Sequence, residues 1–260
     1  MKPVLNIFGI EIVSYSLFMF LALIVVFIGS YFFLTRNGQR KSDVLLMLIV
    51  MSVFAFIGAR AFNFFVNYSF YKSDLAKLFE FSSHGFSLYG GVLGAVFSGF
   101  LIAKLRKIEL FRFADLITPF VGIGIILMRI GCFLNGCCFG KQTDFIFGVK
   151  FPEFSQPHLK QISGSLFSGG LVKTVHPTQI YEVIFVFLCV LLAFYLIFKK
   201  KKLASGSVFL ISGALFSAFR WVNMYFRDLN YSDFVIDVVY PIIYLGIISL
   251  CFGLLLRKNK

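Results

Sequence analysis

The chain has 260 residues, of which 59% are hydrophobic and 14% are charged, and its mean hydropathy is +0.88. Soluble domains balance apolar and charged residues more evenly, so this composition excludes an ordinary soluble protein and indicates an integral membrane protein. A net charge of +13 would also suit a nucleic-acid binder, but the basic residues gather in short clusters at the ends of apolar runs. Such clusters are typical of membrane anchors, so we expect the lipid bilayer as partner and no nucleic acid.

Apolar runs of about 20 residues, the length that spans a bilayer as a helix, recur along the whole chain. They predict seven spanning helices, at Ile10–Leu34, Val44–Val66, Leu88–Ala103, Phe113–Leu134, Thr178–Phe198, Gly206–Phe226 and Phe234–Leu256. The first run is too long for a signal peptide and no small-residue cleavage site follows it, so we expect it to stay as a helix. The sequence therefore predicts an all-α integral membrane protein with a single transmembrane domain over residues 1–260.

The segments between these helices predict the orientation of the chain. Basic residues are dense in Thr35–Asp43, Lys104–Arg112, Lys199–Ser205 and the C-terminal tail, which follow every second helix. The positive-inside rule then places the N-terminus outside and the C-terminus in the cytoplasm, as expected for a protein of an inner membrane. The longest segment, residues 136–175, is rich in Gly, Ser and Pro, and we expect it to form a small external cap between helices four and five.

Three arginines, Arg60, Arg129 and Arg220, lie inside apolar runs, toward the predicted external ends of their helices. An arginine near the bilayer centre costs at least about 2.5–3.5 kcal/mol, so it normally faces a cavity, a partner or a ligand. Guanidinium groups bind phosphate through paired hydrogen bonds, which favours an anionic ligand. The alternative is that each arginine reaches the interface or pairs with an internal carboxylate. Candidate partners are Glu11, Asp115, Glu182 and Asp237.

Glycine-rich and polar motifs accompany these arginines. Tyr89-Gly90-Gly91 opens helix three, and a run from Arg129 through Asn135-Gly136 closes helix four. Small residues let a neighbouring helix or a lipid head group approach the backbone closely. At the start of helix five, His176, Gln179 and Glu182 recur at three-residue spacing and so share one helix face. This pattern indicates a hydrogen-bonded helix start that also holds the arginines.

Four of these motifs occur together in one known family. The glycine-rich opening of helix three, Arg129-x-Gly-x-Phe-x-Asn135-Gly136, His176-Pro-x-Gln179-x-Tyr-Glu182 and Ala-Phe-Arg220 resemble prolipoprotein diacylglyceryl transferases in order and spacing. Ser14-Tyr15 and Gly58-Ala59-Arg60 are also similar to that family. The resemblance covers nearly the full chain and implies seven spans with an external N-terminus in a bacterial cytoplasmic (inner) membrane.

The resemblance also implies an activity. Such enzymes move the diacylglyceryl group of phosphatidylglycerol to the lipobox cysteine of a prolipoprotein signal peptide and release glycerol phosphate. On matching positions, Arg129 and Arg220 would be catalytic, since they would hold the phosphate and stabilise its developing charge. Tyr15 and Asn135 would help to line the head-group site, with Arg60 as a further candidate. Gly90, Gly91, Gly136, His176, Gln179 and Glu182 complete the expected substrate-binding region, with His176 and Glu182 in supporting roles. No cofactor or metal is expected.

The chain departs from the family pattern at several positions. Tyr89, expected to be catalytic, stands where the family often has a histidine that is a candidate base, and a phenol with a pKa near 10 is a poor base. His84 is an alternative base. Cys132, Cys137 and Met224 stand where Asn, Glu and Glu are usual. Two alternatives therefore stay open: a divergent relative with another lipid or acceptor, and a non-catalytic binder of anionic lipid.

The cysteines suggest a further alternative. Cys132, Cys137 and Cys138 are spaced so that a thiol–disulfide or metal site can form where helix four ends. No fourth metal ligand is evident in the sequence, so we expect these side chains to be small apolar fillers.

Overall fold

The computed structural model describes residues 4–7, 9–66, 68–72, 87–153, 155–163, 173–199, 203–229 and 232–258. This described part of the chain is mainly helical. The protein forms two compact units. The larger unit consists of Met1–Val26 and Asp115–Lys260, and the smaller unit is Phe27–Ala114. One continuous helical stretch, Ser14–Arg36, and one helix, Leu110–Asn135, each contain a boundary between the two units.

The larger unit begins with a hairpin of β1 (Val4–Ile7) and β2 (Ile10–Val13), in which Val4 lies opposite Val13. Gly9 adopts a φ of 84°, and its N–H donates to Asn6 Oδ1 at 3.0 Å, which closes the turn. The prediction that the first helix begins at Ile10 was therefore wrong, because α1 begins at Ser14. The β-branched side chains of residues 10, 12 and 13 favour an extended backbone, and the turn supplies a strand to pair with.

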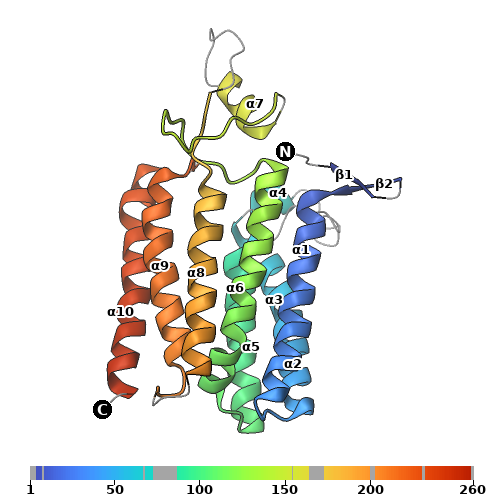
Figure 1. Ribbon diagram of the computed structural model, residues 1–260, viewed down its shortest axis with the longest axis vertical. Coiled ribbons are helices and arrows are strands. Elements are labelled where there is room, and N and C mark those ends of the chain that lie inside the picture. The colour runs from blue at the N-terminus through green and yellow to red at the C-terminus, as the bar shows by residue number, and fades with distance from the viewer. Residues whose placement is uncertain are drawn as a thin grey trace. The chain divides into compact units, whose positions relative to one another are not determined.

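Five long helices make up most of the larger unit, and Figure 1 shows them side by side. They are α1 (Ser14–Ile24), α6 (Leu110–Asn135), α8 (Thr178–Phe198), α9 (Ser207–Phe226) and α10 (Tyr240–Lys258), the last preceded by the π-helical η3 (Val235–Val239). α9 contacts both α8 and α10. Glycines bring α6 close to its neighbours: Gly131 lies against Phe18 of α1, and Gly122 lies against Val190 of α8. Small residues of this kind let helices in a membrane approach closely.

The segment expected to be a cap contains α7 (Gln156–Ser163) and three isolated β-bridges. Gly140 pairs with Arg227, and Val175 pairs with both Gln142 and Val149. Figure 1 shows α7 beyond the ends of α6, α8 and α9. The segment is thus fastened by backbone pairing to the start of α8 and the end of α9.

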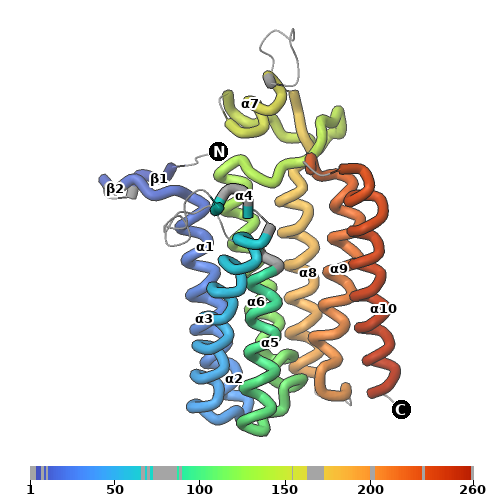
Figure 2. Tube along the Cα trace, turned by 180° about the vertical axis from the view of Figure 1, so that it is seen from behind, coloured from blue at the N-terminus to red at the C-terminus, as the bar shows by residue number. Residues whose placement is uncertain are grey.

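The smaller unit contains α2 (Ser30–Arg36), α3 (Lys41–Val66), α4 (Tyr68–Tyr71) and α5 (Leu88–Arg106), and the π-helical η1 (Val25–Gly29) leads into it. Figure 2 shows α3 and α5 side by side, and they form the largest helix–helix contact of this unit. A Cβ atom on Gly90 would overlap the carbonyl oxygen of Gly58. Glycine at these positions therefore allows the two backbones to touch.

Six helical stretches in the described residues are long and apolar enough to cross a membrane: Ser14–Arg36, Lys41–Phe65, Leu110–Asn135, Thr178–Phe198, Ser207–Phe226 and Val235–Lys258. α5, the third predicted span, is a further helix of 19 residues. Large apolar side chains such as Phe65, Ile184 and Ile242 are exposed on these helices, as lipid contact requires. The prediction of an all-α integral membrane protein with about seven spans is confirmed.

Candidate active site

One buried carboxylate joins two of the arginines that the sequence placed inside the membrane. Glu182 lies near the start of α8, and its side chain is 2% exposed. Arg129 Nε of α6 lies 2.9 Å from Glu182 Oε1, and Arg220 Nη1 of α9 lies 3.0 Å from Glu182 Oε2. Each carboxylate oxygen therefore has its own arginine, and three helices meet at this point. We call Arg129, Glu182 and Arg220 the arginine–glutamate triad.

The triad carries a net charge of +1 in surroundings that exclude most water. The side chains of Arg129 and Arg220 are 9% and 16% exposed. Buried charges are costly unless they are paired, and Glu182 supplies that pairing. Another carboxylate considered as an arginine partner, Asp115, has a different role: it accepts hydrogen bonds from the N–H groups of Gly206 (2.6 Å) and Phe209 (2.8 Å) at the start of α9.

The turn that ends α6 is held in place by the first residues of α8. Gly136 and Cys138 have positive φ angles of 75° and 61°, so the chain reverses sharply here. The reversal presents backbone carbonyl groups to α8. The Gln179 side chain donates to the Cys137 carbonyl oxygen at 2.7 Å, and the Thr178 hydroxyl donates to the Cys138 carbonyl oxygen at 2.8 Å. These bonds satisfy carbonyl groups beyond a helix end and fix α6 against α8.

The end of α9 joins the same network. The Asn223 amide donates to the Thr178 carbonyl oxygen at 3.3 Å, and Asn223 lies three residues after Arg220 on the helix. Tyr244 of α10 also interacts with Arg220. Each triad residue thus lies within one or two helical turns of a polar contact that fixes its helix.

His176 precedes α8 and anchors the cap segment. Its carbonyl oxygen accepts from the Gly140 N–H at 2.9 Å, and its ring Nδ1 lies 3.1 Å from the Tyr181 hydroxyl. A Cβ atom on Gly140 would lie 2.6 Å from that carbonyl oxygen, so the approach requires glycine. Burial lowers the pKa of the His176 imidazole below its ordinary value, so the ring is neutral at pH 7.

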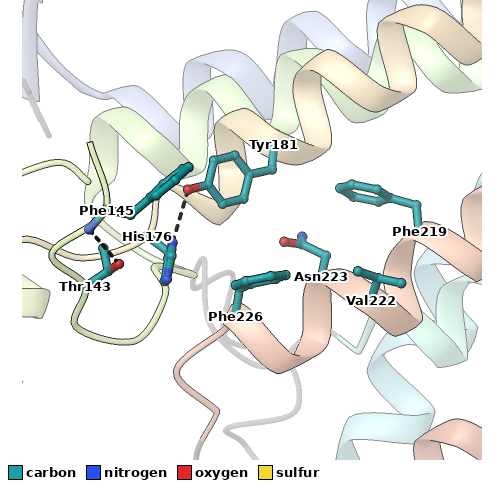
Figure 3. A pocket seen from close by; sticks show the side chains of 8 residues that line it. All are labelled: Thr143, Phe145, His176, Tyr181, Phe219, Val222, Asn223 and Phe226. Carbon is teal, nitrogen blue, oxygen red and sulfur yellow. Dashed lines mark hydrogen bonds between the residues drawn. The ribbon is translucent and has the colours of Figure 1, made fainter. Parts of the chain in front are cut away.

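A cavity of about 560 Å³ adjoins this histidine (Figure 3). Cap residues, the start of α8 and one face of α9 line it: Thr143, Phe145, His176, Tyr181, Phe219, Val222, Asn223 and Phe226. Figure 3 shows the phenylalanine rings around the space, with the His176–Tyr181 pair, the Asn223 amide and the Thr143 hydroxyl as its polar groups. An apolar cavity with a few polar groups suits a substrate that carries apolar side chains or acyl chains.

Three free thiols lie beside the triad. The Sγ atoms of Cys132, Cys137 and Cys138 all lie within 4.8 Å of one another. Arg129 Nη1 lies 4.0 Å from Cys132 Sγ, and the Tyr15 phenol of α1 is close enough to interact with Arg129 and all three thiols. Hydrogen bonds from the other two thiols hold the pKa of the Cys138 thiol below its ordinary value. The sequence analysis expected small apolar fillers and kept a joint thiol–disulfide or metal site as the alternative; the structure places the three thiols together.

A family model described as prolipoprotein diacylglyceryl transferase matches residues 2–256. The chain belongs to this family. Two relatives with the name phosphatidylglycerol–prolipoprotein diacylglyceryl transferase illustrate the similarity. The protein from Clostridium tetani is 30% identical over 229 residues, which cover 87% of this chain and 86% of the relative. The protein from Geobacter sulfurreducens is 29% identical over 215 residues, which cover 79% of this chain and 75% of the relative.

Most residues assigned from the family resemblance lie in the larger unit. Arg129, Arg220 and Glu182 form the triad, Gln179 and His176 hold the surrounding turns, and Tyr15 lies beside the thiols. Asn135 is the last residue of α6, and Gly136 begins the turn. The structure thus brings these residues together, and their roles in the transferase stay predictions.

The remaining assigned residues belong to the smaller unit. Arg60 lies on α3 with its guanidinium 6.0 Å from the centre of the Tyr71 ring. Gly90 and Gly91 face α3 and have a packing role there. Tyr89 lies in the first turn of α5, but its side chain and the alternative base His84 lie outside the described residues.

The sequence analysis missed two residues that contact the site, Asn223 and Tyr244. Asn223 has a signal in the sequence, because an amide in an apolar helix, three residues after Arg220, indicates an internal hydrogen bond. Tyr244 has no such signal in the sequence, because tyrosines are common in membrane helices. Met224, one of the positions at which the sequence was expected to depart from the family pattern, is buried and 4% exposed.

Proposed function

We propose that the protein transfers the diacylglyceryl group of phosphatidylglycerol to the lipobox cysteine of prolipoproteins and releases glycerol phosphate. One observation carries the proposal: Arg129 and Arg220, on two different helices, converge on one buried carboxylate and leave a net positive charge. Membership of the family supplies the reaction class, and the names of the relatives supply the substrates.

The triad has the capacity to bind the phosphate. A guanidinium group has five N–H donors, and each arginine uses only part of this set on Glu182. The donors that remain suit the oxygens of a phosphate group, to which arginine binds with paired hydrogen bonds. In the proposed site Glu182 orients both guanidinium groups and offsets their mutual repulsion, so they need no rearrangement when the anion arrives.

The proposed reaction is a displacement at carbon. The acceptor cysteine attacks as a thiolate, a carbon–sulfur bond forms, and the bond between that glycerol carbon and the phosphate oxygen breaks. The bonding electron pair leaves with glycerol phosphate, whose extra negative charge Arg129 and Arg220 stabilise. The thiol proton goes to a base or to the departing phosphate. Tyr89, at the position where the family often has a histidine, stays a predicted catalytic residue, and Tyr89 and His84 are the two candidates for the base.

The other parts of the site receive roles from their positions. Tyr15 and Asn135 are assigned to the head-group region, and Arg60 stays a further candidate that rests on the family resemblance alone. The cavity beside His176 takes the apolar residues of the prolipoprotein signal peptide, because cap and helix residues line it together. In the proposed orientation the N-terminus is outside and the C-terminus is cytoplasmic, so residues 136–175 form an external cap.

The cavity assignment has its own test. Val222→Trp would fill part of the cavity, and we expect it to raise the KM for a lipobox peptide while the KM for phosphatidylglycerol stays unchanged. Ile242→Trp is the matched control, because Ile242 is an exposed apolar residue of α10 outside the cavity lining. An equal KM for the peptide in both variants would contradict the assignment.

The transfer itself is tested with purified protein, phosphatidylglycerol and a lipobox peptide. Glycerol phosphate release and the mass gain of the peptide are followed together, with Arg129→Ala and Arg220→Ala as test variants. Arg257→Ala is the control, since Arg257 is exposed in the last turn of α10. We expect transfer by the wild type and the control, and its loss in both test variants. A folded wild type that binds the lipid without transfer would favour a non-catalytic lipid-binding protein.

A further inference from the structure

The three thiols beside the triad have the arrangement of a metal site. Cys132 lies in the last turn of α6, and the sharp turn through Gly136 brings Cys137 and Cys138 back toward it. Three thiolates bound to one ion at roughly 2.3 Å lie about 4 Å apart. The Sγ atoms are within 4.8 Å of one another, so only small side-chain movements separate this cluster from a coordinated one.

The backbone that carries the cluster is already fixed. The carbonyl groups of Cys137 and Cys138 accept the Gln179 and Thr178 hydrogen bonds, and the Cys137 N–H donates to the Cys132 carbonyl oxygen at 3.0 Å. These bonds hold the turn through backbone and side-chain oxygen and nitrogen atoms. The Cys137 thiol adds a contact of its own to the Cys132 carbonyl oxygen at 3.6 Å, a weak hydrogen bond that a metal ion would replace. Binding therefore requires little reorganisation of the protein.

The number and type of ligands select the ion. Among the described residues the cluster holds three cysteines, with no histidine or carboxylate as a fourth member. Thiolates are soft donors that select both Cu(I) and zinc. Zinc takes four ligands in a tetrahedron and would need a water molecule beside three cysteines, whereas three thiolates complete the coordination of Cu(I). Three thiolates with Cu(I) carry a charge of −2, and the Arg129 guanidinium, 4.0 Å from Cys132 Sγ, offsets part of it.

We propose that Cys132, Cys137 and Cys138 bind one Cu(I) ion, or another soft monovalent ion such as Ag(I), in three-coordinate geometry. Three sulfur–metal bonds form and the three thiols release their protons to solvent. No electron is transferred. This proposal does not rest on the transferase activity, because the cluster is defined by its own geometry.

The test uses the full-length protein in detergent without oxygen. Cu(I) is supplied from a bicinchoninate complex, and bound copper is measured by mass spectrometry of the metal and by the ultraviolet absorption of the thiolate–Cu(I) bond. We expect about one ion per chain. Cys132→Ser, Cys137→Ser and Cys138→Ser should each lose that ion to the chelator. Cys189→Ser and Cys251→Ser, which change cysteines outside the cluster, should keep it.

A second measurement needs no variant and so does not depend on variant folding. The wild type is alkylated with iodoacetamide, with and without Ag(I), and the modified cysteines are mapped by peptide mass. Ag(I) should protect the three cluster cysteines together and leave Cys189 unchanged. The proposal is overturned if copper binds equally to the cluster variants and the controls, or if the wild type prefers zinc to Cu(I). Peptides linked by a disulfide within the cluster would overturn it as well.

Discussion

Replacing Glu182 by glutamine removes the one negative charge of the triad and leaves its shape nearly unchanged. Two guanidinium groups, 9% and 16% exposed, then share a buried region without a counter-charge. Each ion pair at about 3 Å contributes an attraction of roughly 5 kcal/mol at an effective dielectric constant of 20, part of which offsets the cost of burial. Removing one partner of a buried ion pair lowers the free energy of unfolding by about 3–5 kcal/mol.

The expected result is a clear loss of stability that an anion partly restores. In detergent, Glu182→Gln should lower the melting temperature by roughly 6–20 °C relative to the wild type. Phosphatidylglycerol should raise the melting temperature of the variant more than that of the wild type, because the phosphate takes the place of the lost carboxylate. Uncharged diacylglycerol is the lipid control and should restore nothing.

A matched variant shows whether the effect comes from the triad or would follow from removing a carboxylate anywhere in the protein. Glu153→Gln changes an exposed glutamate of the cap segment and should leave the melting temperature within about 1–2 °C of the wild type. If Glu182→Gln were as stable as Glu153→Gln, the two arginines would not depend on Glu182. The reasoning about the triad would then be refuted.

Three other changes test further contacts. Arg220→Lys keeps the charge but loses the planar set of donors, so transferase activity should fall about 100-fold, measured as glycerol phosphate release. Gly90→Ala places a Cβ atom on the Gly58 carbonyl oxygen and should lower stability by about 1–3 kcal/mol in thermal unfolding. His176, whose pKa burial lowers from 6.5, binds fewer protons in the folded state than in the unfolded state. Stability should therefore fall as the pH drops through 6.5, and His176→Gln should reduce this slope.

Each of these expectations has an outcome that contradicts it. Unchanged activity of Arg220→Lys would show that only the charge at this position matters. Gly246→Ala is the control for the glycine variant, because no atom lies within 4 Å of the added Cβ, and equal stabilities would argue against close packing of α3 and α5. An identical pH dependence of unfolding with and without His176 would assign the slope to other groups.

The helices of the protein were largely predictable, because the bilayer imposes about 20 apolar residues on each span. The failure at Ile10–Val13 has a simple cause. Apolar, β-branched residues satisfy both a spanning pattern and a strand, and only the turn at Gly9 separates the two. The backbone pairing of Val175 with Gln142 and Val149 was not predictable either, since it depends on contacts across a long irregular segment.

The sequence predicted which residues belong to the site, but not which of them pair with one another. Arg129 and Arg220 could be identified as costly charges, and Glu182 was one of four possible counter-charges. That it serves both arginines follows from the packing of α6, α8 and α9, which no spacing along one helix specifies. The spacing of the cysteines allowed a common site only as an alternative, because their approach depends on positive φ angles at Gly136 and Cys138.

The backbone bonds between the cap segment and α9 impose an order on biosynthesis. The Lys141 N–H donates to the Phe226 carbonyl oxygen at 2.8 Å, and the Asp228 N–H donates to the Phe139 carbonyl oxygen at 3.2 Å. Residues 139–141 leave the ribosome more than 80 residues before their partners. Folding of the cap during translation therefore stays incomplete until α9 has been synthesised. A chain that stalls before residue 220 lacks both Arg220 and the partners of its cap, so such a nascent fragment cannot assemble the triad.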